Sequence, residues 1–418
     1  MLSIFEDSQE YTERTKIPFR PTKVTLAEIR AAVPKHLHER STVYAIYYSI
    51  RDVLFAYAVY KLGWTIDPFT LGLVEKYGIS SATFSAIKWS LWSVYWFSES
   101  ICLAGWWCLA HEAGHGTLSD YNWVNHAIGF SLHTFLLVPY YAWRSTHRAH
   151  HKAAASIERD ENYVPRTRSD YKLPPQSVAR LANYHEIFEE APFYTLCRML
   201  LMQLIGWQFY LLRNVMGSPR YPPGTNHFQP SSALFKTHER IPIIACNIAL
   251  IVMLSVIIWW TRQAGFAYFV KLYLVPYIVT NHWIVMLTYL QHSDPTIPHY
   301  RNSQWSFVRG ATSTIDRPLL GFLGRFFLHN ISHDHVAHHL FSSTPFYNQP
   351  AVTEVLKEVL KDEYYNDNTN TFRALYRTFT QCVFIENDDE IAFYKNRDGE
   401  AARELAPDAL EYAPKKMD

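Results

Sequence analysis

Charged residues are scarce in this chain. Of its 418 residues 18% are charged, 49% are hydrophobic and 16% are aromatic, and the formal net charge is only +1. An average soluble domain is about 25% charged, so the composition indicates that much of the surface faces an apolar medium. A balanced charge also offers no long-range attraction to nucleic acid or acidic proteins. We therefore expect membrane lipids, and no nucleic acid, among the partners.

Cysteine is rare, and a secretory signal is missing. The five cysteines are odd in number and scattered, which argues against a disulfide framework or a cysteine-based zinc site. The opening stretch, MLSIFEDSQEYTERTK, is polar and of mixed charge, whereas a cleaved secretory signal is basic and then apolar. We expect a chain that begins in the cytosol, in a reducing compartment.

Long apolar runs predict four membrane spans. The clearest run, IPIIACNIALIVMLSVIIWW, has the roughly twenty uncharged residues needed to cross a hydrocarbon core about 30 Å thick. Two further apolar stretches, at about 124–140 and 196–212, are predicted to lie at the membrane interface, because the first is too short to cross and Arg198 interrupts the second. The four predicted spans cover about residues 43–73, 88–110, 241–260 and 266–290.

Basic residues set the expected orientation. Lysine and arginine crowd the loop after the second predicted span, between residues 144 and 172, but are few after the first and third spans. The positive-inside rule therefore puts this loop and both termini in the cytosol. The final residues, KKMD, resemble a dilysine retrieval signal of the endoplasmic reticulum, which is read from the cytosol. We expect a multi-pass endoplasmic reticulum membrane protein.

Histidine recurs at helical spacing in three places. Residues 111–115 read HEAGH, residues 147–151 read HRAHH and residues 335–339 read HVAHH. Positions i, i+3 and i+4 share one face of a helix, so each group can direct its imidazoles to one point. Each group follows an even number of predicted spans, which puts all three on one side of the membrane. Eight imidazoles in this arrangement indicate a metal site rather than separate solvated histidines.

The number of ligands narrows the kind of metal site more than their type does. Imidazole suits iron, zinc, copper and nickel. A tetrahedral zinc takes at most four protein ligands, so eight histidines leave a surplus that two metals would absorb. Carboxylate-rich di-iron bundles need Glu-x-x-His twice, and here it occurs once, from Glu112 to His115. A histidine-rich two-metal site fits best.

Two other classes of protein stay open at this point. HEAGH also satisfies H-E-x-x-H, the zinc metalloprotease signature in which Glu is the general base. An intramembrane zinc protease would leave HRAHH and HVAHH without a role, and the only Asp-Gly pair, Asp398-Gly399, lies in the polar tail. A non-catalytic membrane receptor or scaffold is the third class, and metal analysis separates the three.

The three histidine groups resemble the histidine boxes of membrane fatty-acid desaturases. The similarity covers roughly residues 20–390 and is closest to the acyl-lipid branch that contains the delta-12 and omega-3 enzymes. The resemblance implies an all-α fold of four transmembrane helices with a cytosolic helical cap that carries a histidine-rich di-iron site. The expected regions are a cytosolic amino-terminal segment (1–42), a desaturase domain (43–390) and a polar cytosolic tail (391–418). The most similar segments are residues 31–41, 136–151, 158–169, 281–300 and 329–348.

The resemblance also implies the cofactors and the residues that hold them. Two non-haem iron ions would activate dioxygen, with electrons from cytochrome b5 and its NADH-dependent reductase. No His-Pro-Gly-Gly haem-binding motif occurs, so we expect the donor to be a separate protein. No separate side-chain base is assigned. Four carboxylates are expected to accept imidazole N–H groups, which would orient the rings: Glu112, Asp160, Asp294 and Asp334. The implied iron ligands are His111, His115, His147, His150, His151, His292, His335, His338 and His339.

The implied reaction inserts a double bond into a phospholipid-bound acyl chain, and we favour oleoyl to linoleoyl. Three positions depart from the delta-12 pattern. Ala113 and Gly116 replace the usual Cys and His or Gln of the first box, and His333 stands just before the third box where Asp or Glu is common. Relatives that form triple bonds, conjugated dienes or hydroxyls differ at such positions. An acetylenase, conjugase, omega-3 desaturase or hydroxylase is therefore the alternative.

Overall fold

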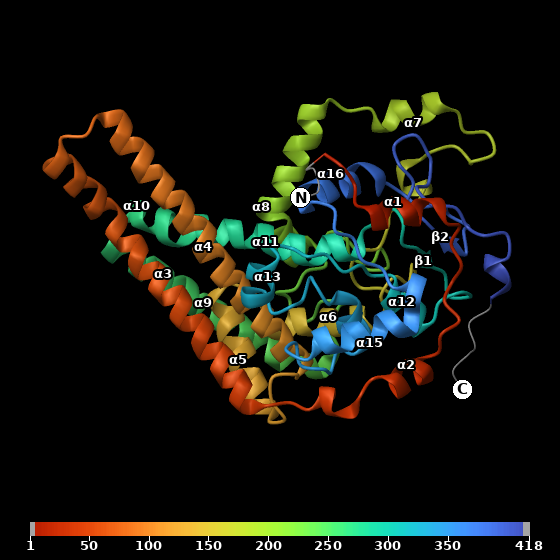
Figure 1. Cartoon of the computed structure of the whole chain (residues 1–418), viewed down its shortest axis with the longest axis horizontal. Coiled ribbons are helices and arrows are strands. Elements are labelled where there is room, and N and C mark those ends of the chain that lie inside the picture. Colours follow the sequence, from red (N-terminus) through yellow and green to blue (C-terminus); the bar gives the residue numbers. More distant parts are fainter. Residues whose placement is uncertain (1–4, 413–418) are drawn as a thin grey trace.

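The computed structural model describes residues 5–412, and its regular secondary structure is almost entirely helical (Figure 1). The strands in this part of the chain, β1 (His299–Tyr300) and β2 (Ile391–Ala392), are two residues long and pair antiparallel. The predicted all-α class is confirmed.

Two long helices form a hairpin that projects from the rest of the molecule (Figure 1). α3 (Thr42–Tyr77) has 36 residues and α4 (Ser81–His115) has 35, which gives lengths of about 54 and 52 Å. Each helix ends at a glycine in the left-handed conformation, with φ of 61° at Gly78 and 81° at Gly116. A residue with a Cβ adopts this conformation at a cost. Gly116 therefore ends α4 directly after the first histidine group.

Three helical segments in residues 5–412 are long and apolar enough to cross a membrane, rather than the four predicted. The predicted spans at 241–260 and 266–290 are among them. The segments are Pro192–Arg213, which is α8; Thr237–Ala264, which joins η3 (Thr237–Glu239) to α9 (Arg240–Ala264); and Phe266–His292, which joins α10 (Phe266–Phe269), the π-helical turn η4 (Val270–Leu274) and α11 (Val275–His292).

The interfacial prediction for residues 196–212 was wrong in length, because α8 continues through Arg198 for 22 residues. A half-exposed arginine near one helix end can reach toward water without interrupting the helix. The predicted spans at 43–73 and 88–110 do form helices, but buried polar groups such as Asp52 and Glu99 lower their hydropathy. Asp52 is bonded to His329 at 2.7 Å, a partner from a distant part of the chain that the composition of a single helix does not reveal.

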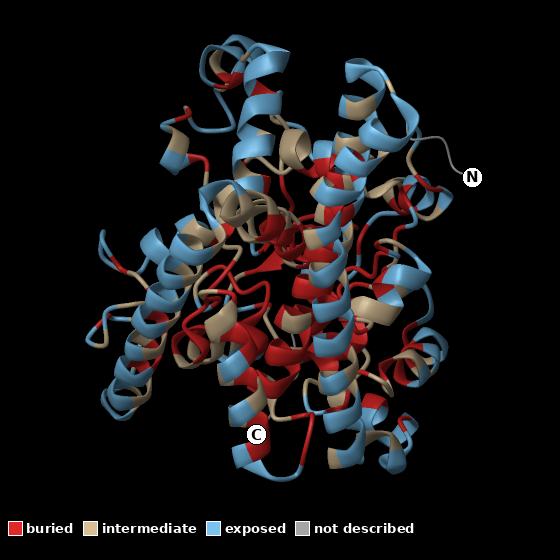
Figure 2. Cartoon of the chain, turned by 90° about the vertical axis from the view of Figure 1, so that its left-hand side faces the viewer, coloured by how far each residue is buried: buried red, intermediate tan, exposed pale blue. Residues whose placement is uncertain are grey.

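Exposed residues cover the outward faces of the long helices, while buried residues gather in the centre of the molecule (Figure 2). Many of the exposed residues are large and apolar. On α9, Ile241, Ile251 and Trp259 are 79%, 64% and 62% exposed. A continuous apolar face of this kind is typical of contact with lipid. α5 (Asn122–Phe135) and α6 (Tyr140–Ala153) have 14 residues each, about 21 Å, and are too short to cross a membrane.

The remaining elements build a cap around the ends of α4, α6 and α11. Both terminal segments join it, since the backbone N–H of Phe19 donates to the carbonyl of Glu404 at 2.8 Å. Its helices are α1 (Gln9–Lys16), α2 (Leu26–Ala32), α7 (Leu181–Phe188), α12 (Phe307–Thr312), α13 (Phe322–Phe327), α14 (His335–Leu340), α15 (Gln349–Leu360) and α16 (Thr371–Gln381). Its short 3₁₀ turns are η1 (Lys35–His38), η2 (Ser169–Tyr171), η5 (Lys361–Glu363) and η6 (Ala409–Glu411).

A buried ion network holds the cap to the end of α11. Arg317 donates to Asp294 at 2.7 Å and to Asp367, and Arg377 of α16 pairs with the same two carboxylates, at 3.3 Å to Asp294. All four side chains are at most 4% exposed. Each charge has an opposite partner, which such deep burial requires. The network fixes the chain two residues after His292.

Candidate metal centre

Nine histidines from four helices converge where the cap meets the bundle. The rings come from the last turn of α4, one face of α6, the end of α11 and the short helix α14. His338 of α14 has its ring centroid 4.7 Å from those of His111 and His151. His339 stacks on His151 with centroids 4.1 Å apart. The rings brought together are His111, His115, His147, His150, His151, His292, His335, His338 and His339.

One cluster contains His111, His115, His147, His151 and His338, whose nearest side-chain nitrogens all lie within 4.8 Å of one another. Its centre is Nε2 of His147, which lies 2.8 Å from Nε2 of His111, 3.0 Å from that of His115 and 3.1 Å from that of His151. A ring nitrogen carries either one N–H or one lone pair. Hydrogen bonding therefore cannot account for three such neighbours, whereas a shared cation can.

A second cluster contains His150, His292 and His339. Nε2 of His292 lies 3.3 Å from Nε2 of His150 and 3.0 Å from Nε2 of His335. His335 donates from Nδ1 to the carbonyl of Ile331 at 3.1 Å. That bond leaves the lone pair on its Nε2, the atom that faces His292.

The nitrogen separations in both clusters fit metal coordination. Two imidazole nitrogens bound about 2.1 Å from one metal, at right angles, are about 3.0 Å apart. Nε2 of His338 and both ring nitrogens of His339 are buried and have no hydrogen-bond partner among residues 5–412. Unpaired buried nitrogens are costly, and a bound cation would remove that cost. The donor set therefore fits two imidazole-bound metals.

Burial keeps the clustered imidazoles in the form that binds metal. The pKa values of His151 and His339 lie well below the ordinary histidine value, first because burial disfavours imidazolium and then because neighbouring rings would repel a second positive charge. Neutral imidazole is the ligating form. The site is therefore ready for cations at neutral pH.

Two of the four predicted carboxylates contact the imidazoles. Asp160 places Oδ1 2.6 Å from Nδ1 of His150. Glu112 places Oε1 3.2 Å from Nδ1 of His111 and 3.7 Å from Nδ1 of His338. A carboxylate on the far ring nitrogen fixes the tautomer and orientation of a metal ligand. Asp160 holds His150 in this way, whereas Glu112 lies close to two imidazoles without a hydrogen bond to Nδ1 of His111.

The other two carboxylates have different partners. Asp294 belongs to the ion network with Arg317 and Arg377. Asp334 pairs with Arg325 at 2.9 Å. Neither makes a hydrogen bond to an imidazole among the described residues. His333, the departure next to the third box, lies outside both clusters, and its ring is near Gly324.

Several groups around the clusters were not predicted from the sequence. Tyr163 stacks on His292 with centroids 4.8 Å apart and an angle of 5° between the rings. Trp143 stacks on His147 at 4.5 Å and 17°. Asp316 accepts the backbone N–H of Val336 at 2.8 Å. Tyr163 lies in the ERDENYVP segment that carried the family resemblance, but no spacing rule connects it to His292.

Two adjoining cavities lead to the imidazoles. The inner one, about 30 Å³, is lined by His111, His147, His150, His292 and His335 together with aromatic side chains. The outer one, about 90 Å³, lies between α8 and α11. Both cavities are lined by the same five residues, which form the passage between them: Asn162, Tyr163, Trp207, Tyr210 and Thr288.

Comparisons of the sequence with known proteins agree with a histidine-rich metal centre at this position. The fatty acid desaturase family model matches residues 90–370. The Delta(12) fatty acid desaturase of Mortierella isabellina is 37% identical over 89% of this chain and 90% of its own length. The oleate hydroxylase of Claviceps purpurea is 34% identical over 91% and 82%. The endoplasmic reticulum omega-6 fatty acid desaturase of Brassica juncea is 33% identical over 91% and 94%.

Proposed function

The chain belongs to the fatty acid desaturase family, and we propose that it inserts a double bond at the twelfth carbon of an oleoyl chain carried by a membrane lipid. The resemblance inferred from the three histidine groups is confirmed. A fungal relative named Delta(12) desaturase and a plant relative named omega-6 desaturase support this regiochemistry. The activity is that of an acyl-lipid oxidoreductase.

The observation that carries the proposal is the convergence of nine imidazoles in two clusters. We assign one iron to the cluster of His111, His115, His147, His151 and His338. We assign the other to His150, His292 and His339, with His335 beside them. Two irons bound there would supply, from dioxygen, the oxidising power to remove hydrogen from an unactivated methylene.

The residues of the chain hold and enclose this centre. Asp160 orients His150 through Nδ1, and Glu112 lies 3.2 Å from Nδ1 of His111. Trp143 and Tyr163 cover the rings of His147 and His292. Aromatic covers of this kind keep water away from the reacting methylene. A partner must supply the electrons, and we propose cytochrome b5 with its NADH-dependent reductase.

The acyl chain is proposed to reach the centre through the passage between α8 and α11. Trp207, Tyr210 and Thr288 line both cavities along this route. The outer cavity is almost wholly apolar and includes Met202, Gly206 and Val285. An apolar passage suits a hydrocarbon chain, and its narrowness fixes which carbon lies beside the imidazoles.

Hydroxylation of the same acyl chain is the second candidate function. The oleate hydroxylase of Claviceps purpurea is nearly as similar to this chain as the desaturases are. Ala113, which departs from the desaturase pattern, is 1% exposed and lies between the two ligating positions of α4. A substitution so close to the ligands is well placed to alter the product.

We propose the endoplasmic reticulum membrane as the location, with both termini in the cytosol. Support comes from three helical segments that can cross a membrane and from the similarity to the endoplasmic reticulum desaturase of Brassica juncea. α4 and α11 both end at the imidazoles, so the centre lies at one end of the helical bundle. The KKMD sequence lies outside the described residues.

The test is expression in a yeast that makes no polyunsaturated lipid, followed by mass spectrometry of the fatty acids. Appearance of a 9,12-diene of eighteen carbons is expected. A 12-hydroxy acid or an alkyne in its place would identify a divergent oxidase. Unchanged fatty acids from a well-expressed protein with an intact electron donor would refute both candidate functions.

A further inference from the structure

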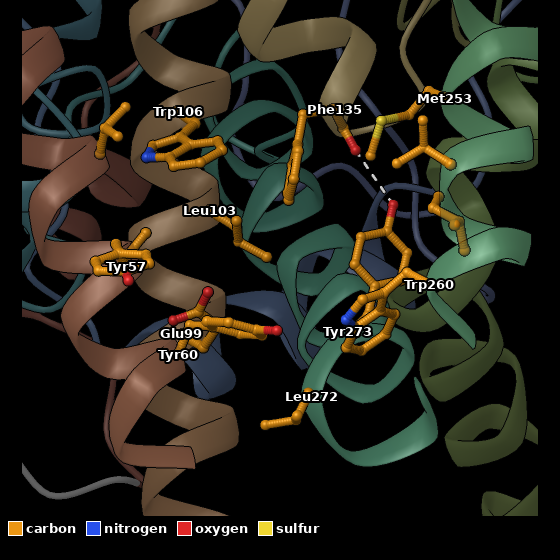
Figure 3. Close-up of a pocket in the computed structure, with 14 residues that line it drawn as sticks. Tyr57, Tyr60, Glu99, Leu103, Trp106, Phe135, Met253, Trp260, Leu272 and Tyr273 are labelled. Atoms are coloured by element: carbon orange, nitrogen blue, oxygen red, sulfur yellow. Dashed lines mark hydrogen bonds between the residues drawn. The ribbon is translucent and has the colours of Figure 1, made fainter. Parts of the chain in front are cut away.

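A separate cavity of about 310 Å³ lies between α3, α4, α9 and the π-helical turn η4 (Figure 3). It shares no lining residue with the cavity beside the imidazoles. Glu99, on its wall, precedes His111 by twelve residues of α4, a distance of about 18 Å along the helix. This cavity is therefore not part of the candidate metal centre.

Glu99 is the one carboxyl in the lining of this cavity. The side chain is 5% exposed, and its Oε2 atom has no hydrogen-bond partner among residues 5–412. In Figure 3 it lies beside Tyr60 on the wall formed by α3 and α4. A buried carboxyl without a partner is costly. A ligand that supplies a polar group at this point would remove the cost.

The apolar lining of the cavity indicates that the polar group of the ligand is a hydroxyl. A carboxyl accepts a hydrogen bond from a hydroxyl in either protonation state. A cationic group would have to lose its hydration inside an apolar cavity, which is far more expensive for a charge than for a neutral hydroxyl. The ligand is therefore a neutral molecule with a hydroxyl and a large apolar body.

The cavity is placed for entry from the lipid. Three residues that line it are also substantially exposed on the outside of the bundle: Val53 at 41%, Tyr57 at 59% and Val256 at 46%. They belong to α3 and α9, and the exposed residues of α9 between Ile241 and Trp259 are apolar except for Ser255. A molecule dissolved in the membrane can reach Glu99 past these side chains without crossing water.

Six of the fourteen residues that line the cavity are aromatic, which favours a rigid ligand. In Figure 3, Tyr57 and Tyr60 lie on one side of the cavity, and Trp260 and Tyr273 lie on the other. Flat walls of this kind pack well on fused rings, and a rigid body loses little conformational entropy on binding. Flexible acyl chains gain less from such walls.

A short sequence pattern on α3 agrees with this choice. Leu54, Tyr57 and Lys61 satisfy the L/V-x₁₋₅-Y-x₁₋₅-K/R pattern associated with sterol contact. Such patterns are common by chance, so this one matters only because Tyr57 lines the cavity. We propose that the cavity binds a sterol, with its hydroxyl on Glu99 and its ring body between the α3 and α9 aromatic side chains.

The test is photolabelling of the full-length purified protein with a sterol that carries a diazirine on its rings. Cross-linked peptides from α3, α4 and α9 are identified by mass spectrometry. Glu99→Leu removes the hydrogen-bonding group and is expected to lower labelling of these peptides about fivefold, the value of one buried hydrogen bond. Glu99→Gln, which still donates and accepts, is expected to stay within about twofold of the parent. Glu75→Leu, at an exposed glutamate of α3, is the matched control.

A second pair of variants tests entry without touching the carboxyl. Val256→Trp blocks the mouth and is expected to abolish labelling, whereas Val94→Trp, at a side chain 64% exposed on α4 and outside the cavity lining, is expected to leave it unchanged. Gel filtration and thermal melting check that each variant is folded. Labelling does not require turnover, so this test does not depend on the proposed function.

Comparison probes decide the ligand class. The same sterol probe without its hydroxyl is expected to label the parent protein as weakly as the intact probe labels Glu99→Leu. A diazirine diacylglycerol, which also carries a single hydroxyl on an apolar body, is expected to label less than the sterol. Equal labelling by the hydroxyl-free probe, stronger labelling by diacylglycerol, or no effect of Glu99→Leu would each overturn the proposal.

Discussion

Oδ1 of Asp160 lies 2.6 Å from Nδ1 of His150, and the same carboxylate accepts the backbone N–H groups of Ala155 and Asn162. Three bonds therefore hold the carboxylate in place before any metal binds. Its orientation turns Nε2 of His150 toward His292. A side chain outside the two clusters thus positions the second cluster.

Asp160→Asn is expected to weaken iron binding or activity by about 10- to 100-fold, the usual effect of removing an oriented partner of a ligating histidine. Iron per chain and diene formation are the measurements. Asp398→Asn is the matched control, because Asp398 also contacts a histidine, His185 at 3.1 Å, but both side chains are about half exposed. Equal effects of the two substitutions would show that Asp160 does not position a ligand.

His147→Ala is expected to remove about one iron per chain and to abolish diene formation, because Nε2 of His147 is central to the first cluster. His338→Ala should behave in the same way, since it joins the same cluster from α14. Metal analysis of the purified variants is the measurement. His238→Ala, at an exposed histidine, should retain full iron content. A single zinc ion in the parent protein would contradict the di-iron assignment.

Arg377→Leu is expected to destabilise the cap by about 3–5 kcal/mol, because Asp294 and Asp367 would then share Arg317 alone and one buried negative charge would lose its opposite partner. Arg377 is 1% exposed and pairs with Asp294 and Asp367. The thermal unfolding midpoint is the measurement. Lys357→Leu removes an exposed ion pair with Glu354 and should change stability by less than about 1 kcal/mol. A small effect at Arg377 would mean that the network contributes little.

The same network should become weaker in acid. Burial alone would raise the pKa of Asp367, but Arg317 and Arg377 outweigh it and hold that pKa well below the usual aspartate range. A depressed pKa in the folded protein stabilises it above the unfolded pKa of about 3.9, and the contribution is lost as the pH falls further. The difference in melting temperature between the parent and Asp367→Asn should therefore stay constant from pH 7 to about pH 5. If the melting temperatures of the two proteins converged between pH 7 and about pH 5, the depressed pKa of Asp367 would not be the source of this stability.

Gly206→Leu is expected to obstruct the passage and to lower conversion of eighteen-carbon chains by about tenfold or more. Gly206 lines the outer cavity, and a Cβ there would meet only Met202 Cγ closely, at 3.3 Å, so the backbone tolerates the change. Gly72→Leu, on α3 with nothing within 4 Å of its Cβ position, is the matched control. Fatty-acid profiles of the two variants decide whether the acyl chain uses this route.

The membrane helices show where the composition of a segment does not predict whether the segment crosses the membrane. Residues 241–260 were predicted correctly because an uninterrupted apolar run is a local property. Arg198 led to the prediction that residues 196–212 lie at the interface, whereas α8 continues through it. The spans predicted at 43–73 and 88–110 form helices but carry buried polar side chains. Asp52 of the first is bonded to His329 at 2.7 Å, a partner from a distant part of the chain.

The sequence by itself determined the helical class and the eight histidines of the three spaced groups, because helical spacing and ligand chemistry are carried by neighbouring residues. His292 was predicted only from the family resemblance. Only the tertiary structure decided which imidazoles share a cluster, separating His147 from His150 although both lie on one face of α6. It also decided that Asp294 pairs with arginine side chains and that Asp160 bonds to an imidazole. These pairings depend on how α4, α6, α11 and α14 pack, and no local spacing encodes contacts between segments so far apart in the chain.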